Sequence, residues 1–265
     1  MAKVKNKTTL SQEEEIRLLA SLASKHINNE KTASSEKVKT NLAVLDYVFG
    51  NGIGLSSVVQ LVGGEHSGKT TVASYCANKI MEHTEKPILY LDFEGQLDPE
   101  WFYYNTGKDL EVHQKITQKI LNGDAALDLS DERLKKLIYY WRGEGLEGMN
   151  ALREMNSSGA FSCVIIDSLS SMRFPQELTE EYDKTLMAQK ARFQTKMLDT
   201  IEHQLSLFDT VFFIINQYRA NLTGYGSARI IPGPYKLRHS SVYIMEMKQL
   251  GGASSEITDA SGILG

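Results

Sequence analysis

Apolar residues fall along this chain of 265 residues in two kinds of segment. Four short segments are almost continuously apolar, which is typical of strands buried on both faces of a sheet; they are residues 58–62, 88–92, 164–167 and 211–216. Other segments carry apolar positions at helical spacing; they are residues 70–83, 149–155 and 188–207. Alternation of strands and helices predicts an α/β fold, with a mostly parallel central sheet flanked by helices.

The N-terminal part of the chain differs from this body. Residues 10–29 form an amphipathic pattern, and Ser11 stands before three glutamates as a helix N-cap. The polar residues 30–39 predict a linker. We therefore expect residues 1–39 to be a helical appendage, whose apolar face packs on its own body or on a neighbouring subunit.

The stretch from residue 105 to residue 148 allows two interpretations. Helical patterns occur at 116–121 and 131–141, with Gly123 and Gly143 as breaks. An inserted helical hairpin would explain them, and so would a single crossover helix with additional loops.

Composition narrows the class of protein. The formal net charge is −4, which argues against a uniformly basic nucleic-acid coat but leaves room for a local basic surface. The two cysteines are too few for a disulfide framework. We see neither a secretory signal nor an apolar run of membrane-spanning length, so we expect a cytoplasmic protein that does not bind membranes.

Residues 63–70 carry the pattern G-x-x-x-x-G-K-[ST] between an apolar strand and a helix. Such a loop converges backbone N–H groups on phosphate oxygens at a helix N-terminus. We expect Lys69 to meet the β- and γ-phosphates and Thr70 to donate an oxygen ligand to Mg²⁺. The predicted nucleotide-binding residues here are Gly63, Gly64, Glu65, His66, Ser67, Gly68, Lys69, Thr70 and Thr71.

Further polar residues end the other predicted strands. Asp167 closes the strand at 164–167 and is our candidate for the magnesium site. Asp92 and Glu94 follow another strand, and alternation puts them on the same side, where either could activate water. The amides of Asn216 and Gln217 end a fourth strand, and either could contact the γ-phosphate.

Four motifs in this order, GGEHSGKTT, LYLDFEGQLDPEW, VIIDSLSSM and FFIINQYR, resemble the RecA recombinase family over nearly the whole chain. The resemblance implies a RecA-like P-loop ATPase core, at residues 40–248, that uses ATP and Mg²⁺. It gives Glu94 the role of the carboxylate that activates water and Gln217 that of the γ-phosphate sensor. It places Asp98 and Trp101 against the adenine, and residues 1–39 in subunit polymerisation.

The resemblance also implies two DNA-binding loops, near residues 173–190 and 219–240. The second contains four basic and no acidic residues, a composition suited to phosphate binding, and its glycines and prolines indicate a mobile loop. The first contains several acidic residues. The predicted DNA-binding residues are Arg173, Arg219, Arg229, Lys236 and Arg238.

By this resemblance we expect an ATP-dependent recombinase, a DNA-dependent ATPase that forms a helical filament on single-stranded DNA and pairs it with double-stranded DNA. A motor or helicase-type ATPase that forms a ring, or a regulatory filament protein that binds ATP without hydrolysis, are the alternatives. His66, the segment 235–239 and the short segment 249–265 depart from the family's pattern. The last predicts a truncated or split product, without the family's lysine-bearing loop that reaches ATP across the subunit interface.

Overall fold

The computed structural model describes residues 36–107, 110–122, 138–156, 159–173, 184–221, 229–249, 258–259 and 262–263. Its centre is a six-stranded sheet in the order β10-β3-β7-β6-β4-β5, in which every pairing is parallel. The strands are β3 (Val58–Gly63), β4 (Ile88–Asp92), β5 (Ile138–Arg142), β6 (Cys163–Asp167), β7 (Val211–Gln217) and β10 (Tyr243–Met247). The predicted α/β class is confirmed.

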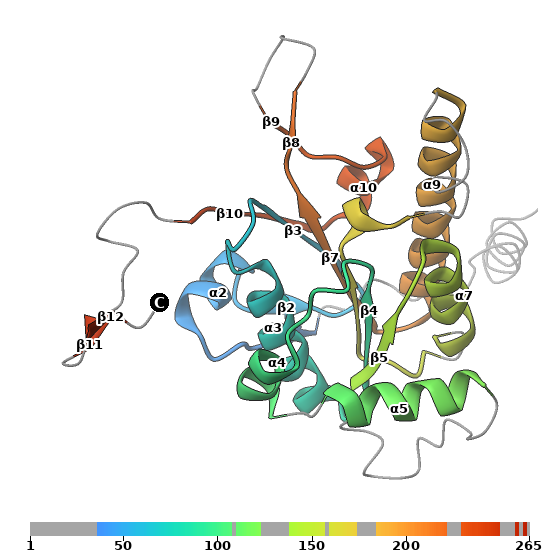
Figure 1. Ribbon diagram of the computed structural model, residues 1–265. Coiled ribbons are helices and arrows are strands. Elements are labelled where there is room, and N and C mark those ends of the chain that lie inside the picture. Colours follow the sequence, from blue (N-terminus) through green and yellow to red (C-terminus); the bar gives the residue numbers. More distant parts are fainter. Residues whose placement is uncertain are drawn as a thin grey trace, which may run out of the picture. The chain divides into compact units, whose positions relative to one another are not determined.

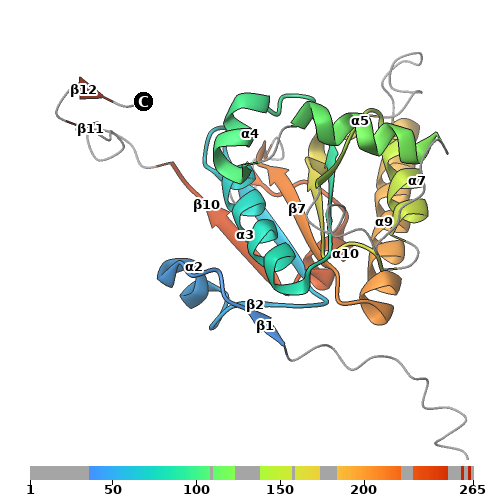
Figure 2. The ribbon, with the colours of Figure 1, turned by 90° about the horizontal axis from the view of Figure 1, so that it is seen from below.

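Helices cover both faces of this sheet (Figures 1 and 2). One face carries α3 (Lys69–Thr84), α4 (Pro99–Thr106) and α2 (Ala43–Val48), and the other carries α7 (Gly145–Met155), α9 (Lys184–Leu207) and α10 (Tyr235–Ser240). Each face has its own apolar cluster, because successive strand residues point to opposite sides: Leu89 belongs to the α7 and α9 side, and Tyr90 to the α3 side. Burial on both faces accounts for the continuous apolar runs.

Short elements complete the described residues. The strands β1 (Lys37–Val38) and β2 (Ile53–Gly54) pair with each other, as do β8 (Arg219–Ala220) with β9 (Arg229–Ile230) and β11 (Thr258–Asp259) with β12 (Gly262–Ile263). The helix α5 (Leu110–Leu121) lies against β5, and the 3₁₀ turn η1 (Leu169–Ser171) follows β6. No helix among the described residues has the length and apolarity needed to cross a bilayer.

The structure corrects one predicted element in the body and adds another. Residues 138–141, the end of the helix predicted at 131–141, belong to the edge strand β5, and α5 lies in the connection between β4 and β5; residues 123–137 lie outside the described residues. A short apolar run is compatible with the periodicity of a helix or of a strand, and here pairing with β4 stabilises the strand. The strand β10 is absent from the predicted elements, and it extends the sheet beyond β3.

The predicted boundaries also shift. The segment Lys37–Val38, predicted as part of the linker, pairs with β2 and so belongs to the body. Residues 184–190 of the first predicted DNA loop belong to α9, which begins at Lys184. The second contains β8, β9 and α10. The predicted helix at 10–29 and the segment 174–183 lie outside the described residues.

Parallel pairing brings the carboxyl ends of four strands to one edge of the sheet. Asp92 of β4 is the register partner of Asp167 of β6, and Gly63 of β3 is the partner of Gln217 of β7. In open α/β sheets, ligands bind beyond this edge. The fold therefore gathers the candidate residues from distant parts of the chain.

Gly148 lets α7 approach the sheet closely. A Cβ at this position would lie 2.6 Å from the rings of both Phe93 and Trp141. We predict that Gly148→Ala lowers the free energy of unfolding by about 1–2 kcal/mol, because overpacking outweighs the gain in helix propensity. Urea denaturation measures the effect, with Asn150→Ala on the exposed side of α7 as the control. A stabilised Gly148→Ala protein would show that the two rings move aside at little cost.

Candidate active site

The loop between β3 and α3 is a tight turn built from glycines. A Cβ at Gly63 would collide with Oγ of Ser67 and lie 2.5 Å from the carbonyl oxygen of Met247, so the backbone approach requires glycine. Gly68 has a φ of 84°, in the left-handed region, and offers no side chain to cap α3. The first N–H groups of α3 therefore face the loop without a side-chain cap, as an anion site at a helix N-terminus requires.

Lys69 extends over this loop. Its side chain is nearly buried, and Nζ donates to the carbonyl of Gly64 at 2.5 Å and to Oγ of Ser67 at 3.4 Å. Burial lowers the pKa of Lys69, and the negative charges of Asp167 and Glu94 oppose this shift. The amine thus sits between the loop and the carboxylates, where a phosphate group would bring it a second partner.

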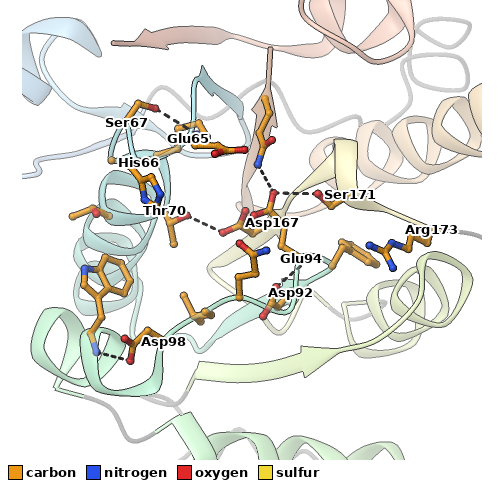
Figure 3. Close-up of a pocket in the computed structure, with 18 residues that line it drawn as sticks. Glu65, His66, Ser67, Thr70, Asp92, Glu94, Asp98, Asp167, Ser171 and Arg173 are labelled. Carbon is orange, nitrogen blue, oxygen red and sulfur yellow. Dashed lines mark hydrogen bonds between the residues drawn. The ribbon is translucent and has the colours of Figure 1, made fainter. Parts of the chain in front are cut away.

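Thr70 and Asp167 meet across the sheet edge. Oγ1 of Thr70 donates to Oδ2 of Asp167 at 2.9 Å (Figure 3). The same oxygen of Asp167 accepts from the hydroxyl of Tyr90 at 2.7 Å. Burial raises the pKa of Asp167 to about 6, and the two hydrogen bonds oppose this shift. A hydroxyl and a carboxylate are hard oxygen ligands, so this pair fits Mg²⁺ beside a phosphate-binding loop.

Glu94 occupies the opposite side of the site. Its Oε1 accepts from Ser168 at 2.6 Å, from Ser171 at 3.1 Å and from Nε2 of Gln217 at 2.9 Å. All three hydrogen bonds go to Oε1. Among the described residues, no side chain donates a hydrogen bond to Oε2. The carboxylate is therefore fixed at one oxygen, and the other is open to a water molecule.

Asp92, the other of the two carboxylates at the end of β4, supports the turn that carries Glu94. It is buried, and its Oδ2 accepts from the hydroxyl of Tyr140 at 2.6 Å. Its Oδ1 accepts from the backbone N–H of Glu94 at 3.1 Å and of Gly95 at 2.6 Å. Of the two carboxylates that alternation places together, Asp92 thus holds the turn and Glu94 faces the site. Asn216 is likewise buried and donates to the carbonyl of Pro232, whereas Gln217 lines the pocket.

These residues surround one pocket of about 700 Å³, a size suited to a nucleotide. Trp101 of α4 is half-buried and lines the pocket. Asp98 also lines the pocket, and its Oδ1 caps α4 by accepting from the N–H of Glu100 at 2.8 Å. The capping bond fixes the start of the helix that carries Trp101. The pocket is lined by Glu65, His66, Ser67, Gly68, Lys69, Thr70, Thr71, Asp92, Phe93, Glu94, Gln96, Leu97, Asp98, Trp101, Asp167, Ser171, Arg173 and Gln217.

The predicted DNA-binding residues do not form one group. Arg173 is exposed in the wall of the nucleotide pocket, and its carbonyl accepts from the N–H of Gly145 at 2.9 Å. Lys236 pairs with Asp199 and Glu202 of α9, so its charge is already neutralised. The other three basic residues lie on β8, β9 and α10 and are Arg219, Arg229 and Arg238.

Sequence reasoning misses the hydroxyl groups around the carboxylates. Ser168 and Ser171 belong to the motif DSLSS, where three serines follow Asp167, and this density of hydroxyls is the signal that could have found them. Tyr90 and Tyr140 carry no such signal, because their partners lie on neighbouring strands.

A phosphate-binding loop, an acidic strand end and a carboxylate beside an amide together define a P-loop nucleotide-binding protein of the α/β class. The RecA N-terminal domain family matches residues 15–261, and the chain belongs to this family. The RecA protein of Ruminococcus albus is 24% identical over 244 residues, which are 90% of this chain and 53% of that protein. For the RecA protein of Fusobacterium nucleatum the identity is 23% over 227 residues, or 85% and 53% of the two chains.

The fold is also found in a solved structure. The crystal structure of the RadB recombinase superposes with a TM-score of 0.53 at 17% identity, covering 81% of this chain and 84% of that one. The chain spans about half the length of the curated relatives it matches. The predicted family and the RecA-like fold are thereby confirmed.

The raised pKa of Asp167 implies that the free energy of unfolding depends on pH. An acid whose pKa rises from 3.8 to about 6 on folding destabilises the ionised protein, by about 2–3 kcal/mol above pH 6. We predict that Asp167→Asn raises the free energy of unfolding of the nucleotide-free protein by a similar amount at pH 8, and that most of this gain is gone at pH 4. Urea titrations at both pH values measure it. A less stable variant at pH 8 would mean that the hydrogen bonds from Thr70 and Tyr90 outweigh the cost of burying the charge.

Proposed function

We propose that this protein is an ATP-dependent DNA recombinase, which binds ATP with Mg²⁺ in the pocket and assembles as a filament on single-stranded DNA to pair it with double-stranded DNA. The observation that carries the proposal is the hydrogen bond of 2.9 Å between Nε2 of Gln217 and Oε1 of Glu94. It joins the carboxylate in the nucleotide pocket to the end of β7, which leads directly into the basic segments β8 and β9.

Six side chains of the pocket have distinct parts in the proposed hydrolysis. The loop N–H groups and Lys69 bind the phosphates, and Trp101 packs against the base. Thr70 and Asp167 would hold Mg²⁺, which neutralises charge on the phosphate oxygens when bound. The open oxygen of Glu94 orients the attacking water and accepts its proton. When ATP binds, Gln217 exchanges its bond to Glu94 for one to the γ-phosphate, and it loses that partner on hydrolysis, so it reports whether the phosphate is present.

The basic residues beyond β7 supply the DNA side of the proposal. Arg219 donates to the carbonyl of Ser170 at 3.4 Å, which links β8 to the turn that carries the serines around Glu94. The guanidinium of Arg229 lies 5.9 Å from the ring centre of Tyr218. Arginine beside an aromatic ring is a composition suited to backbone and base contacts with single strands. We assign Arg173 to the nucleotide instead, because it lines that pocket.

Glu94→Gln tests the catalytic assignment. Amide for carboxylate removes the proton acceptor, so we expect the DNA-stimulated rate of ATP hydrolysis to fall by about 10²–10⁴-fold while ATP affinity stays within about threefold. Steady-state kinetics and equilibrium binding of a fluorescent ATP analogue measure the two effects. Glu82→Gln, on the surface of α3, is the control.

The outcome also separates the alternatives. Unchanged turnover in Glu94→Gln would contradict the proposal and favour a regulatory ATP-binding filament. Loss of turnover, with ring assembly and no strand exchange in the unmodified protein, would favour a motor-type ATPase.

Two neighbouring residues of α10 test the DNA surface. Arg238 is exposed, and no ion pair to it is found within the described part of the chain, whereas Lys236 pairs with two carboxylates of α9. We predict that Arg238→Ala weakens single-stranded DNA binding and reduces the slope of log K against log salt by about 0.7. Lys236→Ala should leave that slope unchanged and lower the thermal midpoint. Fluorescence anisotropy over a salt series measures the slopes of the two variants and the unmodified protein. Equal slopes for all three proteins would show that Arg238 is not part of the DNA-binding surface.

A further inference from the structure

Two buried tyrosines lie side by side beneath the site. Tyr90 of β4 and Tyr140 of β5 are register partners in the sheet, on the face covered by α3. Both are almost completely buried, and their ring centres are 5.9 Å apart. A phenylalanine would fill nearly the same space, so the two hydroxyl groups need their own explanation.

Each hydroxyl reaches diagonally to a carboxylate on the next strand. Tyr140 is opposite Tyr90, and it donates to Asp92, two residues further along β4, at 2.6 Å. Tyr90 is opposite Ile165, and it donates to Asp167, two residues further along β6, at 2.7 Å. Diagonal neighbours of this kind lie within reach of an aromatic side chain. The same step is therefore made twice, from β5 to β4 and from β4 to β6.

The two carboxylates that receive these bonds hold different parts of the site. Asp167 shares its Oδ2 between Tyr90 and the hydroxyl of Thr70 in the phosphate loop. Asp92 uses Oδ2 for Tyr140 and Oδ1 for the backbone N–H groups of Glu94 and Gly95. One tyrosine thus supports the side that would hold the metal, and the other supports the turn that carries Glu94.

We propose that Tyr90 and Tyr140 are positioning residues that orient Asp167 and Asp92 separately, so that metal binding and water activation are supported by two different hydroxyls. The inference rests on the proposed function and adds a division of roles within that site. A buried carboxylate needs donors to stay ionised and in place, and a rigid ring between strands supplies one without adding a positive charge. Neither tyrosine is among the residues that line the pocket, so both act through the carboxylates.

Tyr90→Phe and Tyr140→Phe separate the two roles, because each removes one hydroxyl and keeps the ring. For Tyr90→Phe we expect the Mg²⁺ concentration that half-saturates binding of a fluorescent ATP analogue to rise about three- to tenfold. For Tyr140→Phe we expect kcat to fall about tenfold, with this Mg²⁺ concentration and the KM for ATP unchanged. The first readout is equilibrium binding and does not depend on turnover.

Tyr75→Phe is the matched control. Its hydroxyl donates to the carbonyl of Thr40 at 2.8 Å, away from the carboxylates, so this variant also loses one partly buried tyrosine hydrogen bond. It should leave both readouts at the level of the unmodified protein. A general loss of packing would move all three variants together, whereas positioning moves the two site variants in different readouts.

A double-mutant cycle gives a second measurement, which tests whether Tyr140 acts through Asp92. Should Tyr140 act through Asp92, the variant carrying Tyr140→Phe and Asp92→Asn will have the kcat of Asp92→Asn alone. Additive losses would overturn the proposed path. If the unmodified protein binds the analogue with Mg²⁺ but the two site variants behave as Tyr75→Phe does, the positioning proposal fails and the proposed function stands. If the unmodified protein does not bind it, both fail.

Discussion

The structure depends on keeping three carboxylates together at one edge of a buried sheet. Asp92 and Glu94 end or follow β4, Asp167 ends the adjacent strand β6, and burial together with the two neighbouring negative charges disfavours the ionised form of Asp167. Neutral donors stabilise them: tyrosine hydroxyls below, serine hydroxyls and an amide beside them, and backbone N–H groups in the turn. Because these donors carry no charge, the pocket stays acidic toward a metal ion, with Lys69 as the cation of the loop.

The register of the central sheet places the tyrosine hydroxyls next to the carboxylates. Every pairing in the central sheet is parallel, so the strands end together and their last residues share one edge. A shift of one residue between β4 and β6 would turn Asp167 away from Tyr90, and the same shift between β5 and β4 would turn Asp92 away from Tyr140. The two apolar clusters fix that register, since each strand residue is buried on its own side. Core packing and site geometry are thus consequences of the same alternation.

Features that are local in sequence can be predicted, and features that depend on neighbouring strands cannot. The phosphate loop, Asp167 and Glu94 follow apolar runs directly, so the pattern of those runs is enough to locate them. The segment 138–142 fits a helix by its own pattern as well as a strand, and only pairing with β4 decides between them. Lys236 lies in a segment whose basic composition is typical of DNA binding. Its carboxylate partners on α9 are 34 and 37 residues away in the sequence, so the local pattern does not reveal them.

Gln217 shows why the two ends of the site are linked so closely. Its amide has one short bond to Glu94, and its neighbour Asn216 anchors the carbonyl of Pro232 in the segment between β9 and α10. Adjacent residues of one rigid strand therefore contact the nucleotide pocket and the basic segment. Gln217 ends β7 and β8 begins two residues later at Arg219, so under the proposed function a new partner for Gln217 would act close to the start of β8. Under the proposed function, coupling between nucleotide and DNA would run through the end of β7, where adjacent residues contact the pocket and the segment before α10.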